Sequence, residues 1–301
     1  MSSATTIDTC ANCGKKGGDS LKACTACHMV KYCNRDCQVS HRPMHKKECK
    51  KRAAELYDEK LFKEPPPPEE CPICMSPMPY EMGENVFYSC CGKNICGGCV
   101  LAMMISNKKS GDSLCPYCRV STIISDEEQI KGLERLTNAN NSFAFFQLGG
   151  YYDQGVFGLT QDYQKAHELN LRAGELGCAN GYFNLGNAYD EGRGVSIDKK
   201  KSKHYYGLAA MGGHAVARHI LGCIEGEAGN EHRAIKHMII GARAGYKDSL
   251  DTVKRLFMRG AITKDVYENT LRAYHERQKE MKSDTRDKSE AFNNFPLLGS
   301  Y

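Results

Sequence analysis

Residues 10–49 read CANCGKKGGDSLKACTACHMVKYCNRDCQVSHRPMHKKEC. The metal-binding side chains of this stretch fall into four closely spaced pairs, which are Cys10/Cys13, Cys24/Cys27, Cys33/Cys37 and His45/Cys49. Such spacing lets one short turn present two side chains to a single ion, and paired thiolates with an occasional histidine are the ligand set of structural zinc. Eight ligands therefore predict two four-coordinate zinc ions. The pairs could bind in chain order or interleaved, and interleaving would tie distant pieces of chain together.

The stretch resembles a MYND-type zinc finger, because Lys31-Tyr32 precedes Cys33 and Lys46 follows His45 in the family's register. The resemblance implies interleaved sites, with Cys10, Cys13, Cys33 and Cys37 on one zinc ion and Cys24, Cys27, His45 and Cys49 on the other. It also implies a protein-interaction role, often with proline-rich peptides. One position departs from the family: Arg42 stands where many members carry a tryptophan, and the chain has none.

Two further histidines lie near the predicted ligands. His41 is four residues from both Cys37 and His45, so spacing alone would allow it to bind. The family register and Pro43 favour His45, and a closed tetrahedral site takes no fifth ligand. We expect His28, which follows Cys27 directly, to be a solvated or hydrogen-bonded neighbour.

The remaining clustered cysteines follow the proline run Pro65–Pro68, and fifteen of the seventeen cysteines lie within the first 118 residues. They form the pairs Cys71/Cys74, Cys90/Cys91, Cys96/Cys99 and Cys115/Cys118. This arrangement resembles a RING finger, which implies that Cys71, Cys74, Cys96 and Cys99 share one zinc ion. The second ion would be held by Cys115, Cys118 and the intervening pair. About four zinc ions are therefore expected in the chain, two in each finger.

The second RING-like site departs from the family at Lys93, which occupies the position of a histidine ligand. A protonated lysine has three donors and no lone pair, so it is a poor ligand. Cys90, next to Cys91, would have to supply the missing thiolate. Adjacent ligands are strained, and we expect this site to be weaker, differently shaped or empty.

The predicted sites are closed, so they exclude zinc-activated hydrolysis. The RING resemblance implies instead that Ile73, Pro116 and Arg119 contact a ubiquitin-conjugating enzyme, which a RING-type ligase orients without forming a covalent intermediate. The plainer interpretation is that Ile73 and Pro116 only shape the zinc turns. We identify no catalytic residue and no nucleophile paired with a base, and we expect Cys178 and Cys223 to be packing residues.

Beyond residue 140 the sequence repeats itself. Leucine-glycine pairs end at Gly149, Gly186 and Gly222, which are 37 and 36 residues apart. A second series of glycines stands at Gly177, Gly213 and Gly245, and its shorter last interval predicts a trimmed loop at residues 226–230. A period of this size predicts an α-solenoid of paired helices. The units resemble Sel-one-like repeats, relatives of the tetratricopeptide type, which implies a scaffold that binds protein on its concave face.

The sequence thus predicts a multidomain protein in which two small zinc-stapled modules, MYND-type and RING-like, precede an all-α helical-repeat solenoid. The expected divisions are a MYND-type finger at 1–50, a helix and proline-rich linker at 51–68, a RING-like finger at 69–120, a linker helix at 121–140, repeats at 141–278 and a loose tail at 279–301. A capping box, Ser125 to Glu128, should open the linker helix.

The net charge and the placement of the basic residues limit the kinds of partner that we expect. Net charge is +5, and the main basic run, Lys46 to Arg52, has no accompanying aromatic ladder, so we expect a solvated helix end rather than a nucleic-acid site.

We expect an intracellular protein, cytoplasmic or nuclear and not secreted, because the chain has no signal-peptide pattern and no membrane-length apolar run. A reducing compartment favours metal over disulfides. The predicted function is a zinc-binding adaptor or scaffold for other proteins, and the alternative is a RING-type ubiquitin ligase whose repeats bind substrate.

Overall fold

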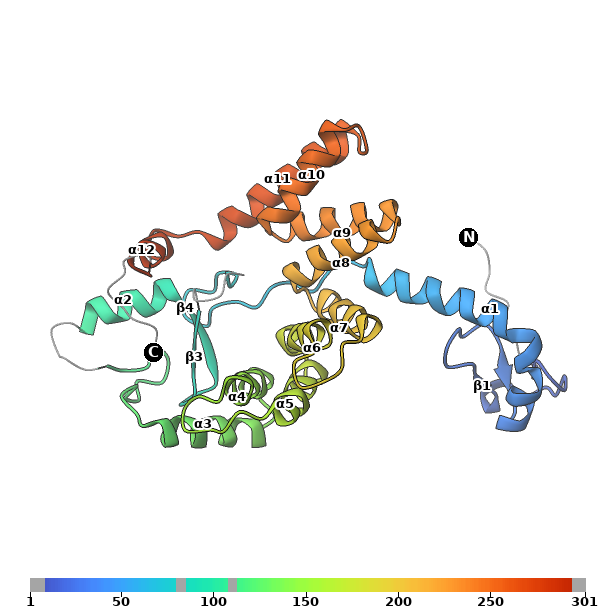
Figure 1. Ribbon diagram of the computed structural model, residues 1–301, viewed down its shortest axis with the longest axis horizontal. Coiled ribbons are helices and arrows are strands. Elements are labelled where there is room, and N and C mark those ends of the chain that lie inside the picture. The colour runs from blue at the N-terminus through green and yellow to red at the C-terminus, as the bar shows by residue number, and fades with distance from the viewer. Residues whose placement is uncertain (1–8, 80–84, 108–112, 294–301) are drawn as a thin grey trace. The chain divides into compact units, whose positions relative to one another are not determined.

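The computed structural model describes residues 9–79, 85–107 and 113–293, and these divide into two compact units, Met1–Lys63 and Glu64–Tyr301 (Figure 1). The final part of the predicted tail, residues 294–301, lies outside the described residues.

The first unit consists of a short hairpin and one long helix. A 3₁₀ turn, η1 (Gly18–Ser20), precedes strands β1 (Lys22–Ala23) and β2 (Lys31–Tyr32), which pair antiparallel, and helix α1 (Arg35–Leu61) follows. The Asn34 side chain caps α1 by accepting a hydrogen bond from the backbone N–H of Cys37 at 2.8 Å. The helix expected within residues 51–68 is therefore the last part of a longer helix that begins among the predicted ligands.

The core of the first unit is very small. Its main cluster of buried side chains consists of Cys10, Leu21, Cys24, Cys27 and Tyr32. Three of these five are cysteines, so ordinary apolar burial contributes little to the stability of this unit. A module of this size needs a staple, which agrees with the prediction of bound metal.

The basic run Lys46 to Arg52 is largely exposed, as expected, but it lies in the middle of α1 and not at a helix end. Arg52 Nη1 forms ion pairs with Glu55 at 3.1 Å and with Glu59 at 2.9 Å, and all three side chains are partly exposed. Among the described helices, none has both the length and the apolar character needed to cross a membrane.

The second unit begins with the other cysteine-rich segment. Strands β3 (Asn85–Tyr88) and β4 (Lys93–Cys96) form an antiparallel hairpin in which Val86 faces Ile95, and helix α2 (Gly97–Asn107) follows β4 directly. The buried cluster beneath them contains Cys71, Met78, Ile95 and Cys96. Here too, half of the buried cluster is cysteine.

Helix α3 (Asp126–Asn138) joins this module to the repeats. Both hydrogen bonds of the predicted Ser125–Glu128 capping box are formed. The buried residues Ile130 and Leu133 pack in one cluster with Leu148 of the next helix, and Phe87 of β3 packs against the same cluster. The linker helix is therefore the first layer of the array and lies against the hairpin.

Six antiparallel helices of 13 residues each form the body of the array, and they pack in consecutive pairs. The pairs are α4 (Ser142–Gln154) with α5 (Tyr163–Glu175), α6 (Ala179–Glu191) with α7 (Lys199–Met211), and α8 (Ala215–Glu227) with α9 (Glu231–Arg243). The third pair has the predicted short loop, since only residues 228–230 separate its helices. Helices α10 (Lys247–Met258) and α11 (Lys264–Met281) continue the array.

The recurring glycines stand where each helical pair turns into the next. Gly177, Gly213 and Gly245 have φ angles of +96°, +92° and +101°. This left-handed region is open to glycine at little cost, which explains the periodic series found in the sequence.

The last helix returns to the cysteine-rich module. Helix α12 (Asp284–Asn293) packs against α2, so the predicted tail is helical as far as Asn293 and is docked rather than loose (Figure 1). Nothing in the sequence indicated this contact, because α12 is polar and its partners lie about 200 residues earlier. The cysteine-rich module of the second unit therefore packs against both α3 and α12.

Candidate metal centres

The structure brings the sixteen predicted ligands into four compact groups. The groups are Cys10/Cys13/Cys33/Cys37, Cys24/Cys27/His45/Cys49, Cys71/Cys74/Cys96/Cys99 and Cys90/Cys91/Cys115/Cys118. Within each group, all four ligand atoms lie within 4.8 Å of one another. We number these groups as sets one to four, in the order given.

The spacing of the sulfur atoms fits zinc. A tetrahedral ion with Zn–S bonds of about 2.3 Å has S–S edges of about 3.8 Å. The Sγ–Sγ distance is 3.7 Å for Cys74/Cys96, 3.8 Å for Cys91/Cys115 and 3.9 Å for Cys71/Cys99. A disulfide would need a distance of about 2.05 Å, so these sulfurs are arranged around a common centre rather than bonded in pairs.

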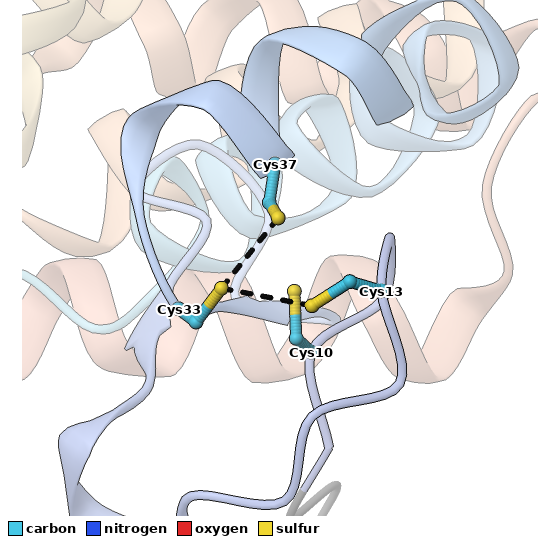
Figure 2. Close-up of side chains that lie close together, drawn as sticks. All are labelled: Cys10, Cys13, Cys33 and Cys37. Atoms are coloured by element: carbon cyan, nitrogen blue, oxygen red, sulfur yellow. Dashed lines mark hydrogen bonds between the residues drawn. The ribbon is translucent and has the colours of Figure 1, made fainter.

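Set one shows the interleaved pairing (Figure 2). Cys13 Sγ lies 3.7 Å from Cys33 Sγ, and Cys33 Sγ lies 3.5 Å from Cys37 Sγ. The first pair, on the loop before η1, therefore meets the third pair at the start of α1. Of the two arrangements that spacing allowed, the structure has the interleaved one, which ties distant pieces of the chain together.

Set two contains His45, and His41 lies outside it. His45 Nε2 is 3.2 Å from Cys27 Sγ, whereas His41 Nδ1 is 3.0 Å from the Tyr32 hydroxyl. The His41 ring also stacks on the His45 ring, with 5.6 Å between centroids. His41 thus supports the orientation of His45 without entering the group.

The four Cys-x2-Cys pairs that precede a tight turn all use the same backbone geometry. The residue after the second cysteine donates its N–H to the carbonyl of the first cysteine at 2.9–3.0 Å, and these residues are Gly14, His28, Met75 and Arg119. Their φ angles are +71°, +56°, +57° and +64°. Three of the four are not glycine, so each costs about 1 kcal/mol of backbone strain that metal binding would offset.

Set four is formed by adjacent cysteines. Cys90 Sγ lies 3.4 Å from Cys118 Sγ, while Cys91 Sγ faces Cys115. Gly92 has a φ angle of +70°, which turns the chain immediately after the pair. Lys93 is exposed, with its Nζ 5.6 Å from the centroid of the Tyr117 ring, and takes no place in the group. The strain expected of adjacent ligands does not prevent the four sulfurs from gathering as closely as in the other sets.

The electrostatics of the sets favour a divalent cation. The backbone N–H of Cys13 lowers the pKa of Cys10 to about 6, whereas the hydrogen bond of Cys33 to Cys37 Sγ, together with burial, raises the pKa of Cys33 to about 12. In set four, burial raises the pKa of Cys91 to about 11. Four crowded thiols therefore do not all ionise at neutral pH by themselves, and a soft dication such as Zn²⁺ is the partner that allows them to.

The positions implied to contact a conjugating enzyme lie on two of the metal turns. Ile73, on the turn of set three, is 42% exposed, and Pro116, on the turn of set four, is half-buried. Arg119 is exposed, and its Nη1 lies 3.3 Å from Met103 Sδ of α2. Arg119 therefore also has a structural role, because its backbone closes the turn of set four and its side chain contacts α2.

The two cysteines beyond residue 118 have different surroundings. Cys178 is buried before α6, as predicted, but Cys223 is exposed, which corrects the expectation that it packs in the array. Cys223 Sγ lies 3.7 Å from His219 Nε2, a pairing the sequence did not indicate. Desolvation raises the pKa of Cys223, so this thiol remains protonated and is not an activated nucleophile.

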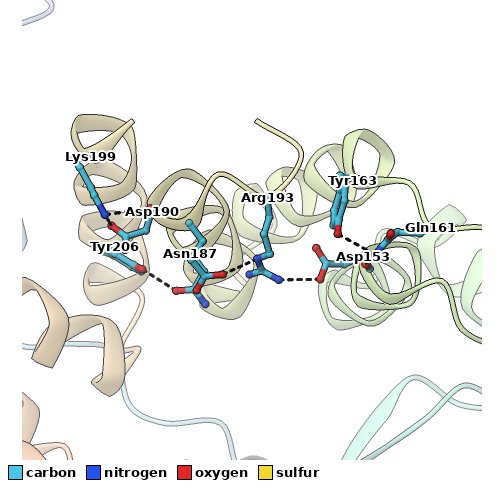
Figure 3. A network of polar contacts seen from close by, with 9 residues as sticks. Asp153, Gln161, Tyr163, Asn187, Asp190, Arg193, Lys199 and Tyr206 are labelled. Carbon is cyan, nitrogen blue, oxygen red and sulfur yellow. Dashed lines mark hydrogen bonds and ion pairs between the residues drawn. The ribbon is translucent and has the colours of Figure 1, made fainter. Parts of the chain in front are cut away.

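A polar network that the sequence did not predict links consecutive repeats (Figure 3). Arg193, in the loop after α6, pairs with Asp153 of α4 at 2.9 Å, and Lys199 pairs with Asp190 at 2.8 Å. Asp153 and Asp190 stand 37 residues apart, at the same position of successive repeats. Only the Asp153 contact joins two repeats, because Asp190 and Lys199 lie in the same repeat, so the recurrence of the aspartate does not by itself indicate the contact between repeats.

Family comparison identifies two of the three modules. Residues 10–49 match the MYND finger, and residues 143–178 and 179–214 match the Sel1 repeat. The chain therefore contains a MYND finger and Sel1 repeats, as their sequences predicted, whereas the RING resemblance stays a prediction. Together with the four metal groups, these matches define a zinc-binding protein built from protein-interaction modules.

Three solved structures are similar to the chain. A Sel1 repeat protein from Oxalobacter formigenes has 22% identity and a TM-score of 0.44, with 59% of this chain and 71% of that chain covered. A protective antigen of uropathogenic Escherichia coli has 15% identity and a TM-score of 0.29, with coverages of 58% and 46%. An immunity protein from Pseudomonas aeruginosa has 15% identity and a TM-score of 0.28, with coverages of 60% and 84%.

Proposed function

We propose that this protein is a zinc-stapled adaptor, in which sixteen side chains hold four zinc ions and the fingers and the repeat array bind different proteins. The observation that carries the proposal is that each metal set has four protein donors. A four-coordinate zinc ion has no open position for water or substrate, so its role is structural. The bound zinc ions would then hold the binding surfaces of the two fingers in place.

Exposed apolar side chains on the metal-bearing modules support a binding role. Met44 is 80% exposed on α1 of the MYND finger, one residue before the predicted ligand His45. Ile73, Tyr117 and Val120 are exposed on the turns of the RING-like module. These turns are held by the metal sets, so the apolar groups are presented rigidly and lose little entropy when a partner covers them.

The second candidate function is a RING-type ubiquitin ligase, and the observation that favours it is the exposure of Ile73 on the turn of set three. In this case Ile73, Pro116 and Arg119 would contact the conjugating enzyme, and the Sel1 repeats would bind substrate. The protein would orient the thioester of the conjugating enzyme and would form no covalent intermediate.

One assay separates the two functions. Full-length protein is incubated with activating enzyme, a panel of conjugating enzymes and ubiquitin, beside an Ile73→Ala variant. The adaptor proposal expects no ubiquitin chains with any conjugating enzyme. Chains that form with the wild-type protein and disappear with Ile73→Ala would establish the ligase and overturn the adaptor proposal.

A second experiment tests the adaptor proposal directly. Partners are captured by chemical crosslinking in cells that express the wild-type chain, Met44→Glu or Ile197→Glu, and each partner is then tested with purified protein. Ile197 is 62% exposed in the repeat array, so the two substitutions affect separate modules. The proposal expects each variant to lose a different partner and keep the others. Identical direct partners for all three proteins would contradict it.

A further inference from the structure

An arginine from the C-terminal helix reaches into metal set three. Arg286 of α12 is 8% exposed, and its Nη2 donates to Cys74 Sγ at 3.4 Å. The same nitrogen lies 3.2 Å from the carbonyl oxygen of Ser76, and Nη1 donates to the carbonyl oxygen of Pro77 at 2.6 Å. One buried guanidinium thus contacts a predicted ligand and the turn that follows it.

The position of Arg286, in the first turn of α12, is fixed by contacts with α11 and with α2. Nη1 also donates to the carbonyl of Met281, the last residue of α11, at 2.7 Å, and α11 is tied to the array by a hydrogen bond from Gln278 to the carbonyl of Gly245 at 2.9 Å. On the other side, Gly98 of α2 lies against α12. A Cβ added to Gly98 would lie 2.9 Å from the backbone nitrogen of Arg286, so the close approach of the two helices requires a glycine there.

The charge of set three explains why a cation is useful there. Four thiolates and one Zn²⁺ carry a net charge of −2, and this excess is only partly screened by water, because Cys71 and Cys96 are buried while Cys74 is exposed and Cys99 is half-buried. A guanidinium has five donors and no acceptor, so it can bond to a thiolate and to several carbonyls at once. The nearest comparison is Arg135 at set four, which donates to the carbonyls of Cys90 at 2.7 Å and Ser89 at 3.3 Å.

We propose that Arg286 is a positioning residue of metal centre three, and that zinc binding at this centre and docking of α12 stabilise each other. The inference rests on the proposed binding of zinc by set three. Arg286 offsets the negative charge of the centre and holds Cys74 and its turn in place. Since coupling between two binding events is reciprocal, loss of α12 docking weakens zinc binding by the same factor by which loss of zinc weakens docking. The RING-like module is then completed by the C-terminal helix and is not an independent finger.

The first test measures zinc release from the full-length protein. Wild type, Arg286→Ala, Arg286→Lys and the control Lys288→Ala, an exposed cation of the same helix, are exposed to a chelator. Alkylation of the released cysteines, located by peptide mass spectrometry, identifies the set that opens. Substitution of a group that orients a metal ligand typically weakens metal binding about 10- to 100-fold. We expect Arg286→Ala to speed alkylation of set three by that factor and to leave sets one and two unchanged.

Arg286→Lys guards against a simple failure to fold, because it keeps the charge and loses the fork of donors. We expect an intermediate rate for Arg286→Lys and the wild-type rate for Lys288→Ala. Equal rates of set-three alkylation in wild type, Arg286→Ala and Arg286→Lys would overturn the role of Arg286. The zinc proposal fails in a distinguishable way: set three of the wild-type protein would then be alkylated at once, before any chelator is added.

The second test measures the reciprocal effect by hydrogen exchange. Cys71→Ser removes a ligand of set three but keeps the Cys74 contact of Arg286. We expect faster exchange in the backbone of residues 284–288 of this variant, and wild-type exchange there in Cys13→Ser, which disrupts set one instead. Unchanged protection of α12 after loss of zinc from set three would contradict the coupling.

Discussion

The adjacent cysteines of set four give the most specific prediction about metal binding. Cys90→Ser replaces a thiolate by a hydroxyl of similar shape, and Cys90 Sγ is 3.4 Å from Cys118 Sγ. If Cys90 is the fourth ligand, this substitution removes one of four metal bonds. Lys93→Ala, the matched control, removes a side chain that is exposed and lies only near the Tyr117 ring.

The expected size of the effect follows from the four-ligand geometry. Binding of structural zinc contributes about 10–16 kcal/mol. Shared among four ligands, this is about 2.5–4 kcal/mol for each, or a loss of about 10²–10³ in affinity for Cys90→Ser. Lys93→Ala loses at most a cation–π contact of about 0.5–1 kcal/mol and keeps all four ligands.

The affinity of set four is measured on the full-length protein by competition against fluorescent chelators of graded strength, and native mass spectrometry counts the ions retained. The three other sets of the same molecule are the internal reference. We expect one ion to leave Cys90→Ser at a chelator strength that leaves wild type and Lys93→Ala intact. If Cys90→Ser kept its ion as tightly as wild type, or if Lys93→Ala lost one, the assignment of set four would be wrong.

Two further predictions concern the repeat array. Gly181→Ala would place a Cβ 2.3 Å from the carbonyl oxygen of Asn170, so we expect the free energy of unfolding in urea to fall by about 2–3 kcal/mol. Gly150→Ala is the control, because nothing lies within 4 Å of its added Cβ, and its free energy of unfolding should rise by about 0.5–1 kcal/mol. Equal effects of the two substitutions would contradict the close helix contact. The second prediction concerns His214, whose Nδ1 accepts a hydrogen bond from the Ala217 N–H. Burial lowers the pKa of His214 to about 4, so the folded state favours the neutral ring. The free energy of unfolding should therefore fall as the pH drops below about 6.5, the pKa of an unperturbed histidine. Between pH 7 and pH 5 we expect a loss of about 2 kcal/mol in the free energy of unfolding. His214→Asn can still cap α8 and should not show this loss. The same dependence of stability on pH in both proteins would refute the role of His214.

Spacing alone was sufficient to predict most of the ligand pairs, whereas the way in which pairs combine into metal sets was implied by the resemblance to known fingers. Two cysteines three residues apart must lie on one turn, so each pair is defined locally and only the pairing of pairs was open. The capping box at Ser125 and the glycine series ending at Gly245 were predictable for the same reason, because their geometry depends on a few neighbouring residues.

What could not be predicted depends on contacts between distant parts of the chain. The choice between Cys90 and Lys93 is decided by where β3 and β4 direct the turn, and a spacing rule does not contain that information. The docking of α12 depends on one arginine and on the space left by Gly98, both of which are ordinary in their local sequence. Arg135 of α3, which reaches the Cys90 carbonyl, looked like any charged residue on a solvated helix face.

The most direct test of the account is the number of zinc ions bound by the purified full-length chain, counted by native mass spectrometry and checked by metal analysis. Four closed sets predict four ions per chain, and removal of these ions with a strong chelator should abolish cooperative unfolding of residues 9–63, whose core is largely cysteine. A count of three would mean that one of the four sets binds no zinc ion. A count of two or fewer, or a first unit that stays cooperatively folded without metal, would contradict the claim that zinc holds these modules together.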